Sequence, residues 1–303
     1  MKKILSLLIV LIIVAAAFSG CSKTASKSDY VVKVGSKDFT EQLVLAQIAM
    51  QALEYNGIKT EDKSNVSGSD TCRKALESGE FDMYWEYTGT AWMMLLGNEP
   101  LVADSQQMWD KVKAADEKNN IVWINYAPLN NTYALAMAQA RSSELGITTY
   151  TQLGQYIKNN PGALVLACDH EFTARPDGLP GLVEMYGTDF GDGISTMDMG
   201  IVFKTLADGQ ADVGMVFATD GRIKANNLIV LKDDKNFFPI YNAAPCVRKD
   251  AMDKVPKIAD VLNPISAKLT DGIMQELNYK VDGDGMEPNE VAQEWLKQEG
   301  FIK

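Results

Sequence analysis

The feature that most constrains the fold is a segment that occurs twice in the chain. The stretch ALESGEFDMYWEY, from Ala75 to Tyr87, has Leu, Gly, Asp and a closing aromatic residue in the same register as TLADGQADVGMVF, from Thr205 to Phe217. Each copy indicates a helix end, a glycine turn and a strand that finishes at an aromatic side chain. Because ligands of open α/β sheets bind beyond the carboxyl ends of the strands, two similar lobes would place Tyr87 and Phe217 on opposite walls of one cleft. A chance match is the alternative, since helix–Gly–strand patterns are common.

Short strands and helices alternate along the rest of the chain, which is typical of α/β layers with mostly parallel sheets. We expect strands at 31–34, 81–87, 132–138, 164–168, 213–217, 228–231 and 240–243. A first helix should have Thr40 as its N-cap and stop at Gly57, and residues 64–69 should form a polar loop. We expect further helices at 70–78, 105–119, 150–159, 181–186 and 199–208, and mainly helix after the last strand.

The N-terminal segment is typical of an export signal. Two lysines precede an apolar run from Ile4 to Phe18, which is shorter than the roughly 20 apolar residues of a membrane-spanning helix. Small residues and Cys21 follow, as in a bacterial lipobox, so we expect a signal peptide at 1–20 and a lipidated tether at 21–28. This arrangement predicts a lipid anchor on the extracytoplasmic face of the cell membrane. An uncleaved membrane anchor is the alternative, and it also leaves the rest of the chain outside the cytoplasm.

Composition and motifs argue against nucleic-acid binding and catalysis. A net charge of −11 repels nucleic acid and anionic lipid headgroups. The single histidine, His170, is not accompanied by a G-x-S-x-G elbow, and Cys72, Cys168 and Cys246 lack C-x-x-C spacing. We therefore expect a protein that is not an enzyme and uses no cofactor or metal. A secreted hydrolase that depends on His170 is the runner-up hypothesis from another class.

Aromatic residues stand at or near the ends of four predicted strands, at Tyr87, Tyr133, Phe217 and Tyr241. Ring faces carry negative potential and attract a cation such as trimethylammonium, which has no hydrogen bond to offer. Each such contact contributes roughly 0.5–2 kcal/mol when desolvated. Three or four faces could therefore give micromolar binding, about −8 kcal/mol. For any one of these residues alone, ordinary core packing is the simpler interpretation.

Several blocks of sequence follow one another along nearly the whole chain after the N-terminal segment. They are GSKDFTEQ (35–42), YWEYTGT (84–90), NTYAL (131–135), EF (171–172) with RPDGLPGL (175–182), TDGRI (219–223) and FFPIY (237–241). Taken together, these blocks resemble the substrate-binding proteins of ABC importers for glycine betaine, choline and carnitine.

The resemblance implies a two-lobed periplasmic-binding-protein-like fold of type II, α/β in class, with a ligand cleft between the lobes. One lobe would comprise residues 29–132 plus 241–303, and the other residues 133–240. It implies that a quaternary-ammonium ligand such as glycine betaine is held in an aromatic cage and passed to an ABC permease. By motif, the cage falls on Tyr87, Tyr133, Phe217 and Tyr241, and the other end of the ligand falls to Lys37, Gln42, Thr90 and Arg175. Phe217 departs from the family's usual Tyr, and it keeps the ring face but lacks the hydroxyl.

Lys37 and Arg175 are the basic residues within the motifs that face the predicted cleft. A buried guanidinium needs a partner, and its two parallel donors suit a carboxylate. We therefore predict that carboxylate-bearing betaines bind better than choline. The alternative is that Arg175 bridges the lobes through an acidic residue such as Glu171 and never touches the ligand. A second alternative keeps the two lobes but has an amino acid or an oxyanion as ligand.

Overall fold

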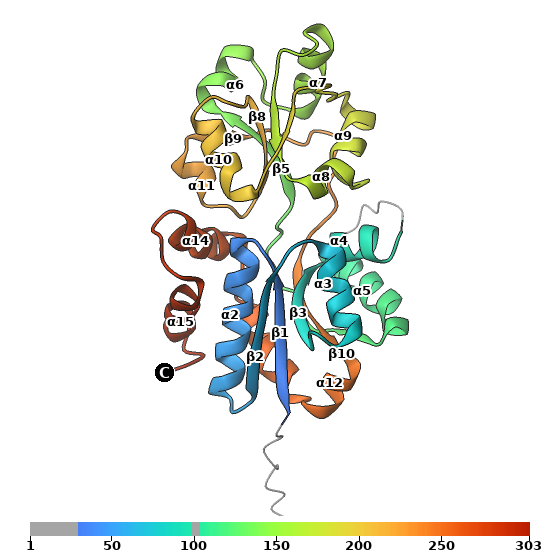
Figure 1. The fold of residues 1–303 in the computed structure, drawn as a ribbon, viewed down its shortest axis with the longest axis vertical. Coiled ribbons are helices and arrows are strands. Elements are labelled where there is room, and N and C mark those ends of the chain that lie inside the picture. Colours follow the sequence, from blue (N-terminus) through green and yellow to red (C-terminus); the bar gives the residue numbers. More distant parts are fainter. Residues whose placement is uncertain (1–29, 99–103) are drawn as a thin grey trace, which may run out of the picture.

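The structure is a computed structural model that describes residues 30–98 and 104–303. The predicted signal peptide, Cys21 and the tether lie outside these residues. In the two described ranges, no helix is long and apolar enough to cross a membrane. The chain folds into two α/β lobes stacked along the long axis of the molecule (Figure 1).

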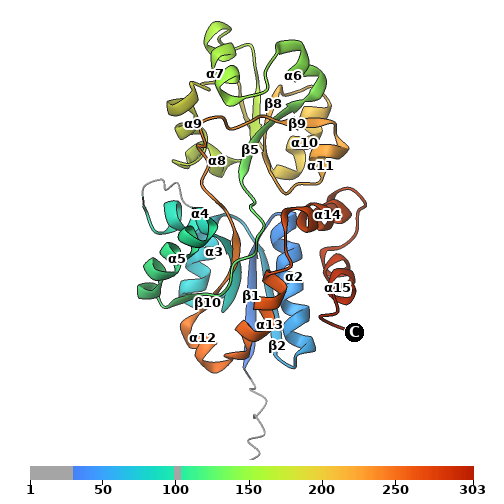
Figure 2. The same cartoon turned by 180° about the vertical axis from the view of Figure 1, so that it is seen from behind.

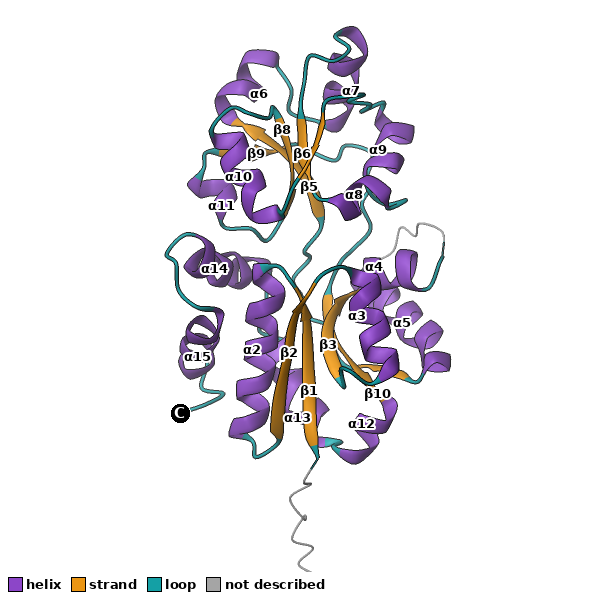
Figure 3. Ribbon diagram, viewed as in Figure 1, coloured by secondary structure: helices purple, strands orange, loops and turns teal. Residues whose placement is uncertain are grey.

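The first lobe is built on a five-stranded sheet with the order β2-β1-β3-β10-β4. Its strands are β1 (Val31–Lys37), β2 (Lys59–Val66), β3 (Met83–Tyr87), β4 (Ile121–Trp123) and β10 (Ala243–Arg248). Its helices are α2 (Thr40–Tyr55), α3 (Ser69–Ser78), α4 (Thr88–Thr90), α5 (Ser105–Asp116), α12 (Lys249–Lys254), α13 (Lys257–Ser266), α14 (Asp271–Asp282) and α15 (Pro288–Gln298). Helices flank the sheet on both sides, with α2 and α14 on one side and α3 and α5 on the other (Figure 3).

The second lobe is built on a five-stranded sheet with the order β7-β6-β8-β5-β9. Its strands are β5 (Tyr133–Ala138), β6 (Leu166–Cys168), β7 (Ile194–Thr196), β8 (Val213–Phe217) and β9 (Leu228–Val230). Its helices are α6 (Gln139–Leu145), α7 (Tyr150–Asn159), α8 (His170–Ala174), α9 (Leu179–Tyr186), α10 (Met199–Ala207) and α11 (Arg222–Ala225).

The two sheets have the same topology, and both are mixed. In the first, β1 is parallel to β2 and β3, whereas β10 is antiparallel to β3 and β4. In the second, β6 is parallel to β7 and β8, whereas β5 is antiparallel to β8 and β9. The expectation of mostly parallel sheets therefore needs correction. β5 and β10 each follow a crossing between the lobes, so each starts at the cleft and runs against the strands that end there.

The repeated segment occupies equivalent places in the two lobes, as β3 and β8. Each strand is preceded by a helix and a glycine with positive φ. Asp82 Oδ2 accepts a hydrogen bond from the backbone N–H of Lys33 at 2.9 Å, and Asp212 Oδ2 accepts one from Val165 at 2.9 Å. The two aspartates thus tie the start of each strand to its neighbour in the same way, so the sequence match reflects a shared local structure.

Three local predictions differ from the structure. Thr40 is the first residue of α2 and not its cap, and its hydroxyl donates to Asp282 Oδ1 at 2.7 Å. Residues 64–66 belong to β2, an edge strand of polar and mostly exposed side chains that has no hydrophobic pattern to reveal it. The strand predicted at 240–243 begins only at its last residue and continues as β10.

Two chain segments cross between the lobes and lie side by side (Figure 2). Asn130 and Asn242 form an antiparallel bridge. The backbone N–H of Tyr241 donates to Asn130 Oδ1 at 2.8 Å, and that of Asn131 donates to the carbonyl of Tyr241 at 3.1 Å. This pairing holds Tyr241 in one crossing beside Tyr133, which directly follows the other.

Candidate functional site

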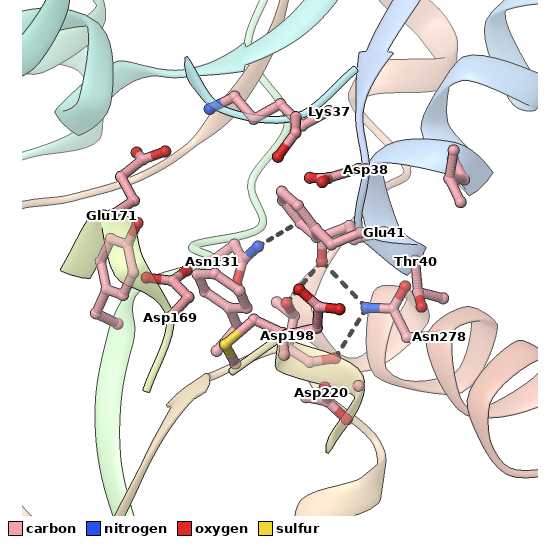
Figure 4. A pocket seen from close by; sticks show the side chains of 18 of the residues that line it. Lys37, Asp38, Thr40, Glu41, Asn131, Asp169, Glu171, Asp198, Asp220 and Asn278 are labelled. Carbon is pink, nitrogen blue, oxygen red and sulfur yellow. Dashed lines mark hydrogen bonds between the residues drawn. The ribbon is translucent and has the colours of Figure 1, made fainter. Parts of the chain in front are cut away.

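A cavity of about 640 Å³ lies between the lobes, within the range of small-molecule sites in proteins. Its walls come from the end of β1, the start of α2, the ends of β3 and β8, the start of β5, the crossings and α14. Because these strands end or start at the cleft, side chains far apart in sequence meet there (Figure 4). The cavity is therefore where the fold predicts a ligand.

All four residues of the predicted aromatic cage line this cavity. Tyr133 and Phe217 are paired across neighbouring antiparallel strands, with ring centroids 5.1 Å apart. Tyr241 stands edge-on to Tyr133 at 5.6 Å, with an interplanar angle of 82°. Tyr87 lies on the wall that the first lobe contributes. The structure thus brings aromatic rings from both lobes and from one crossing to a single site.

Phe39 is a fifth ring at the cavity, and the sequence reasoning did not assign it to the site. Its ring stacks on Phe217 of the second lobe at 5.2 Å and on Tyr87 of the first lobe at 6.3 Å. Phe39 follows the end of β1 by two residues, so it meets the same criterion of an aromatic residue at a strand end. A longer predicted first strand would have revealed it.

Hydrogen bonds behind the rings hold the three tyrosines in place. The hydroxyl of Tyr87 donates to Glu41 Oε1 at 2.7 Å, and that of Tyr241 donates to Asp177 Oδ2 at 2.5 Å. The hydroxyl of Tyr133 accepts from Arg175 at 2.9 Å. Burial raises the pKa of all three phenols well above its usual value, so they remain protonated.

The residues expected at the other end of the ligand are divided between the cavity wall and the layer behind it. Lys37 and Thr90 line the cavity, whereas Gln42 and Arg175 do not. Gln42 is fully buried, and its side-chain oxygen accepts a hydrogen bond from the backbone N–H of Lys37 at 3.3 Å. Lys37 itself forms a buried ion pair with Glu86 at 2.7 Å.

Arg175 already has protein partners for its guanidinium group. Its Nε and one terminal nitrogen donate to the carboxylate of Asp177 at 2.8 and 2.6 Å. The other terminal nitrogen donates to Glu171 at 2.8 Å and to Tyr133 at 2.9 Å, and the nitrogen that is bound to Asp177 also donates to the hydroxyl of Thr90 at 3.4 Å. The premise that this buried charge lacks a partner is therefore wrong. The pairing with Glu171 that we gave as the alternative is present, and Asp177 is a second acidic partner.

Carboxylates outnumber basic groups around the cavity. The acidic side chains that line it are Asp38, Glu41, Asp169, Glu171, Asp198, Asp220 and Asp282. The basic ones are the exposed His170, Lys37, which pairs with Glu86, and Arg222, which pairs with Asp220 at 2.6 Å and Asp282 at 3.2 Å. An excess of negative charge in a cleft raises the local concentration of cations. The electrostatics thus favour a positively charged group in this site.

Glu41 is the most deeply buried of these carboxylates, at 2% exposure. Its Oε1 accepts from Tyr87 at 2.7 Å and from Asn131 Nδ2 at 2.9 Å. Its Oε2 accepts from Thr219 at 2.6 Å and from Asn278 Nδ2 at 3.2 Å (Figure 4). Burial raises the pKa of Glu41, against the lowering effect of these four hydrogen bonds. The sequence reasoning quoted Glu41 within a motif but gave it no role.

The lobes also touch beside the cavity on two sides. Ser69 of α3 donates from its hydroxyl to Glu171 of α8 at 2.9 Å and from its backbone N–H at 3.3 Å. On the other side, Gln275 of α14 donates to the carbonyl of Ala218 in the second lobe at 3.0 Å. These contacts and the bridge from Glu41 to Thr219 link the two lobes around the cavity.

The alternative of a hydrolase finds no support at this site. His170 lines the cavity but is exposed, and within residues 30–98 and 104–303 its ring makes no hydrogen bond to a Ser, Asp or Glu side chain. Cys72, Cys168 and Cys246 are buried free thiols. In the same two ranges, no group of three or more metal-ligand side chains lies together.

Two α/β lobes around an aromatic, acidic cavity define a solute-binding protein of the periplasmic type II class. Residues 31–298 match the family described as the substrate binding domain of ABC-type glycine betaine transport systems, and the chain belongs to this family. This membership confirms the predicted family and the absence of an enzymatic role, because the family binds solutes for import. It also makes the chain an extracytoplasmic binding protein.

Individual relatives agree with this assignment. The glycine-betaine-binding protein of Pseudomonas aeruginosa is 39% identical over 277 residues, which cover 89% of this chain and 88% of that protein. The structure of ligand-free YehZ from Escherichia coli is 34% identical, covers 89% of this chain and 99% of that one, and superimposes with a TM-score of 0.66. The structure of a glycine betaine/carnitine/choline ABC transporter is 28% identical, covers 90% of this chain and 100% of that one, and has a TM-score of 0.73. The predicted two-lobed type II fold is therefore confirmed.

Proposed function

We propose that this protein is a lipoprotein, anchored through Cys21, that captures a quaternary-ammonium compound similar to glycine betaine for an ABC importer. The observation that carries the proposal is the meeting of rings from both lobes, Tyr87, Tyr133 and Phe217, with Tyr241 of the crossing at one acidic cavity. Relatives named as glycine-betaine-binding proteins support the same ligand class. The proposed lobes are residues 29–132 plus 241–303 and residues 133–240.

The cage would bind the ammonium group by cation–π contacts. Each contact is worth roughly 0.5–2 kcal/mol once water is excluded, so four rings at the upper end of this range approach the roughly −8 kcal/mol of micromolar affinity. Phe217 supplies a ring face as a tyrosine would, and Phe39 extends the aromatic wall toward Tyr87. The carboxylates around the cavity add attraction for the ligand's positive charge before and after it enters.

The polar end of the ligand would meet Lys37 and Thr90, which line the cavity. Gln42 and Arg175 would act from behind the wall. Gln42 holds the backbone at Lys37, and Arg175 holds the hydroxyl of Tyr133. Because Asp177 and Glu171 already pair with Arg175, this guanidinium attracts a ligand carboxylate less strongly than an unpaired guanidinium would. The predicted preference for betaines over choline remains a prediction that binding measurements decide.

Calorimetry with glycine betaine, carnitine, choline and a set of amino acids tests the proposed ligand class. We expect micromolar binding of at least one quaternary-ammonium compound and no binding of amino acids with a primary ammonium group. Tyr55→Leu, on the exposed end of α2, is a matched control for variants of the cage tyrosines. Tight binding of an amino acid or an oxyanion without any quaternary-ammonium binding would contradict the proposal.

The lipid anchor has a separate test. We expect the wild-type protein to fractionate with membranes and to incorporate labelled fatty acid. The Cys21→Ser variant should lose the label. A wild-type protein that is exported without any label would show that the anchor is absent, and this result would leave the ligand proposal intact.

A further inference from the structure

Glu41 is a buried carboxylate whose hydrogen-bond partners are all neutral. Two hydroxyl groups and two side-chain amides donate to it, and they come from β3, one crossing, the second lobe and α14. Among the described residues, Glu41 has no ion pair. An anion that is buried with neutral donors alone is costly, because hydrogen bonds only partly replace its hydration.

The charged groups around Glu41 do not supply the missing cation. Those that share the cavity wall at the end of β1, in the second lobe and on α14 are Lys37, Asp38, Asp169, His170, Glu171, Asp198, Asp220, Arg222 and Asp282, with Glu86 on β3 behind them. Lys37 is held by Glu86 and Arg222 by Asp220 with Asp282, and His170 is exposed. The remaining groups on the elements packed against α2 are exposed or paired with each other: Lys59, Glu61, Asp62 and Lys63 on β2, Lys257 and Asp260 on α13, Asp271, Glu276 and Lys280 on α14, and Glu290, Glu294 and Lys297 on α15.

The position of Glu41 points to the ligand as its partner. The carboxylate lines the cavity and contacts the hydroxyl of Tyr87, one of the cage rings. Phe39 precedes it by two residues, and its partner Thr219 follows Phe217 by two residues. Glu41 therefore lies behind the rings at which a quaternary ammonium would rest.

We propose that Glu41 is the counterion of the ligand's ammonium group and that ligand binding drives a proton off this carboxyl. The inference rests on the proposed function and adds a linked reaction to it. Below its raised pKa, Glu41 in the empty site is a neutral carboxyl, and its O–H then donates to the Thr219 hydroxyl in place of the bond that Thr219 gives to the carboxylate. Arrival of a monovalent cation converts it to a carboxylate, its O–H bond breaks, and the proton passes to the solvent. Charge is conserved, because one positive charge enters the site and one leaves it.

The direction of the pH dependence follows from this exchange. Burial raises the pKa of Glu41 in the empty protein above its ordinary value of 4.5, and a bound cation lowers it again. Affinity for the ligand should therefore rise with pH from the pKa of Glu41 in the complex and level off once pH exceeds its raised pKa in the empty protein. By linkage, each unit by which the ligand lowers this pKa corresponds to about a tenfold gain in affinity.

Proton release can be measured on the unmodified protein. Choline is the probe, since neither its ammonium nor its hydroxyl titrates near neutral pH. It is titrated into the protein at neutral pH in phosphate and in Tris, whose ionisation enthalpies differ, and at acidic pH in acetate and in MES, which form a second such pair. We expect proton release wherever the empty site is protonated, together with an affinity that rises with pH. Choline binding with identical enthalpy in both buffers and the same affinity at every pH would overturn the inference. Glycine betaine is used in the same way if choline does not bind.

Glu41→Gln separates this role from a structural one. The amide keeps the shape of the side chain but carries no charge, so we expect about tenfold or greater weakening of choline binding and no proton release. Asp38→Asn removes the same charge from an exposed position on the same wall, and screening by water should limit its effect to about twofold. Equal weakening by both variants would mean that the overall charge matters and not Glu41. If the wild-type protein binds no quaternary-ammonium compound at all, it is the proposed function that fails.

Discussion

Two polar clusters lie behind the aromatic rings of the cavity, and they differ in charge balance. In the Arg175 cluster, made of Arg175, Asp177, Glu171, Tyr133 and Tyr241, the buried guanidinium is paired with two carboxylates, and Asp177 is the one that is fully buried. In the Glu41 cluster, made of Glu41, Tyr87, Asn131, Thr219 and Asn278, the one charged group has only neutral partners. Both clusters orient cage tyrosines. The difference indicates that the charge of Arg175 has partners without ligand, whereas a negative charge on Glu41 has none among the described residues.

The largest effect on stability should come from removing the guanidinium of the Arg175 cluster. Arg175→Ala leaves Asp177 buried without its cationic partner, and the loss of a buried pair in this way typically costs about 3–5 kcal/mol. We expect this loss in the free energy of unfolding by urea, measured without ligand. Adding Asp177→Asn should restore part of it, because no charge then stays unpaired. A loss below about 1 kcal/mol would mean that water reaches Asp177 and that the two clusters are less different than the structure indicates.

The next effect concerns the two rings that the Arg175 cluster holds, those of Tyr133 and Tyr241. Replacing Tyr133 or Tyr241 by Ala should weaken binding by about 1–2 kcal/mol, roughly five- to thirtyfold. Leu should be nearly as damaging, because it restores bulk but not the ring face. Tyr241→Phe keeps the ring and controls for loss of the bond to Asp177. Calorimetry gives the affinities, and Leu variants that bind like the wild type would show that these residues only pack.

A smaller effect should appear in the stability of the ligand-free protein against pH. The pKa of Glu41 is raised by burial, so the folded state keeps a proton that the unfolded chain loses above its ordinary pKa of 4.5. This contribution to stability is fully present below 4.5 and is lost as pH rises through the raised pKa, with a slope of at most about 1.4 kcal/mol per pH unit. Urea unfolding of the wild type and Glu41→Gln at several pH values gives the difference. A difference that does not change with pH would show that Glu41 titrates alike in the folded and unfolded chain.

Other carboxylates make the folded protein more stable as pH rises, which is opposite to the effect of Glu41. The contribution of Glu41 is therefore obtained by subtracting the unfolding free energy of Glu41→Gln from that of the wild type. Burial opposes ionisation of Glu171, but the positive charges of Lys37 and Arg175 and the bonds from Ser69 lower its pKa below the ordinary value. The contribution of Glu171 to the stability of the folded state is present above pH 4.5 and is lost as pH falls through its lowered pKa. Because this term is common to the wild type and to Glu41→Gln, it cancels in their difference.

The smallest expected effect is a change in overall size. Two lobes joined by two short crossings can close by hinge motion, and ligand bound between the clusters should favour the closed form. We expect a smaller radius of gyration in solution scattering at saturating ligand. The same scattering profile with and without bound ligand would contradict hinge closure. Such a result would fit lobes that are already held together by contacts such as Ser69 with Glu171.

Much of the fold could be predicted from local patterns. The repeated segment located β3 and β8, and the α/β alternation located α2, α3, α5, α7, α9 and α10 within a few residues. It missed the short helices α4, α6, α8 and α11 and the three-residue strands β4 and β7, and it missed β2 because an exposed edge strand of polar residues carries no hydrophobic signal. It also missed the mixed character of the sheets, since strand direction depends on where a crossing enters a lobe and not on the residues of the strand.

The sequence by itself determined the class of fold, the family and four aromatic residues that line the cavity, Tyr87, Tyr133, Phe217 and Tyr241, because strand ends and motif blocks are local features. Only the tertiary structure decided which charges are balanced. The partners of Arg175 and the four donors to Glu41 come from segments separated by long stretches of chain, and no local pattern records that they meet. Since the state of a buried charge depends on those partners, the electrostatic character of the site emerged only when the lobes were brought together.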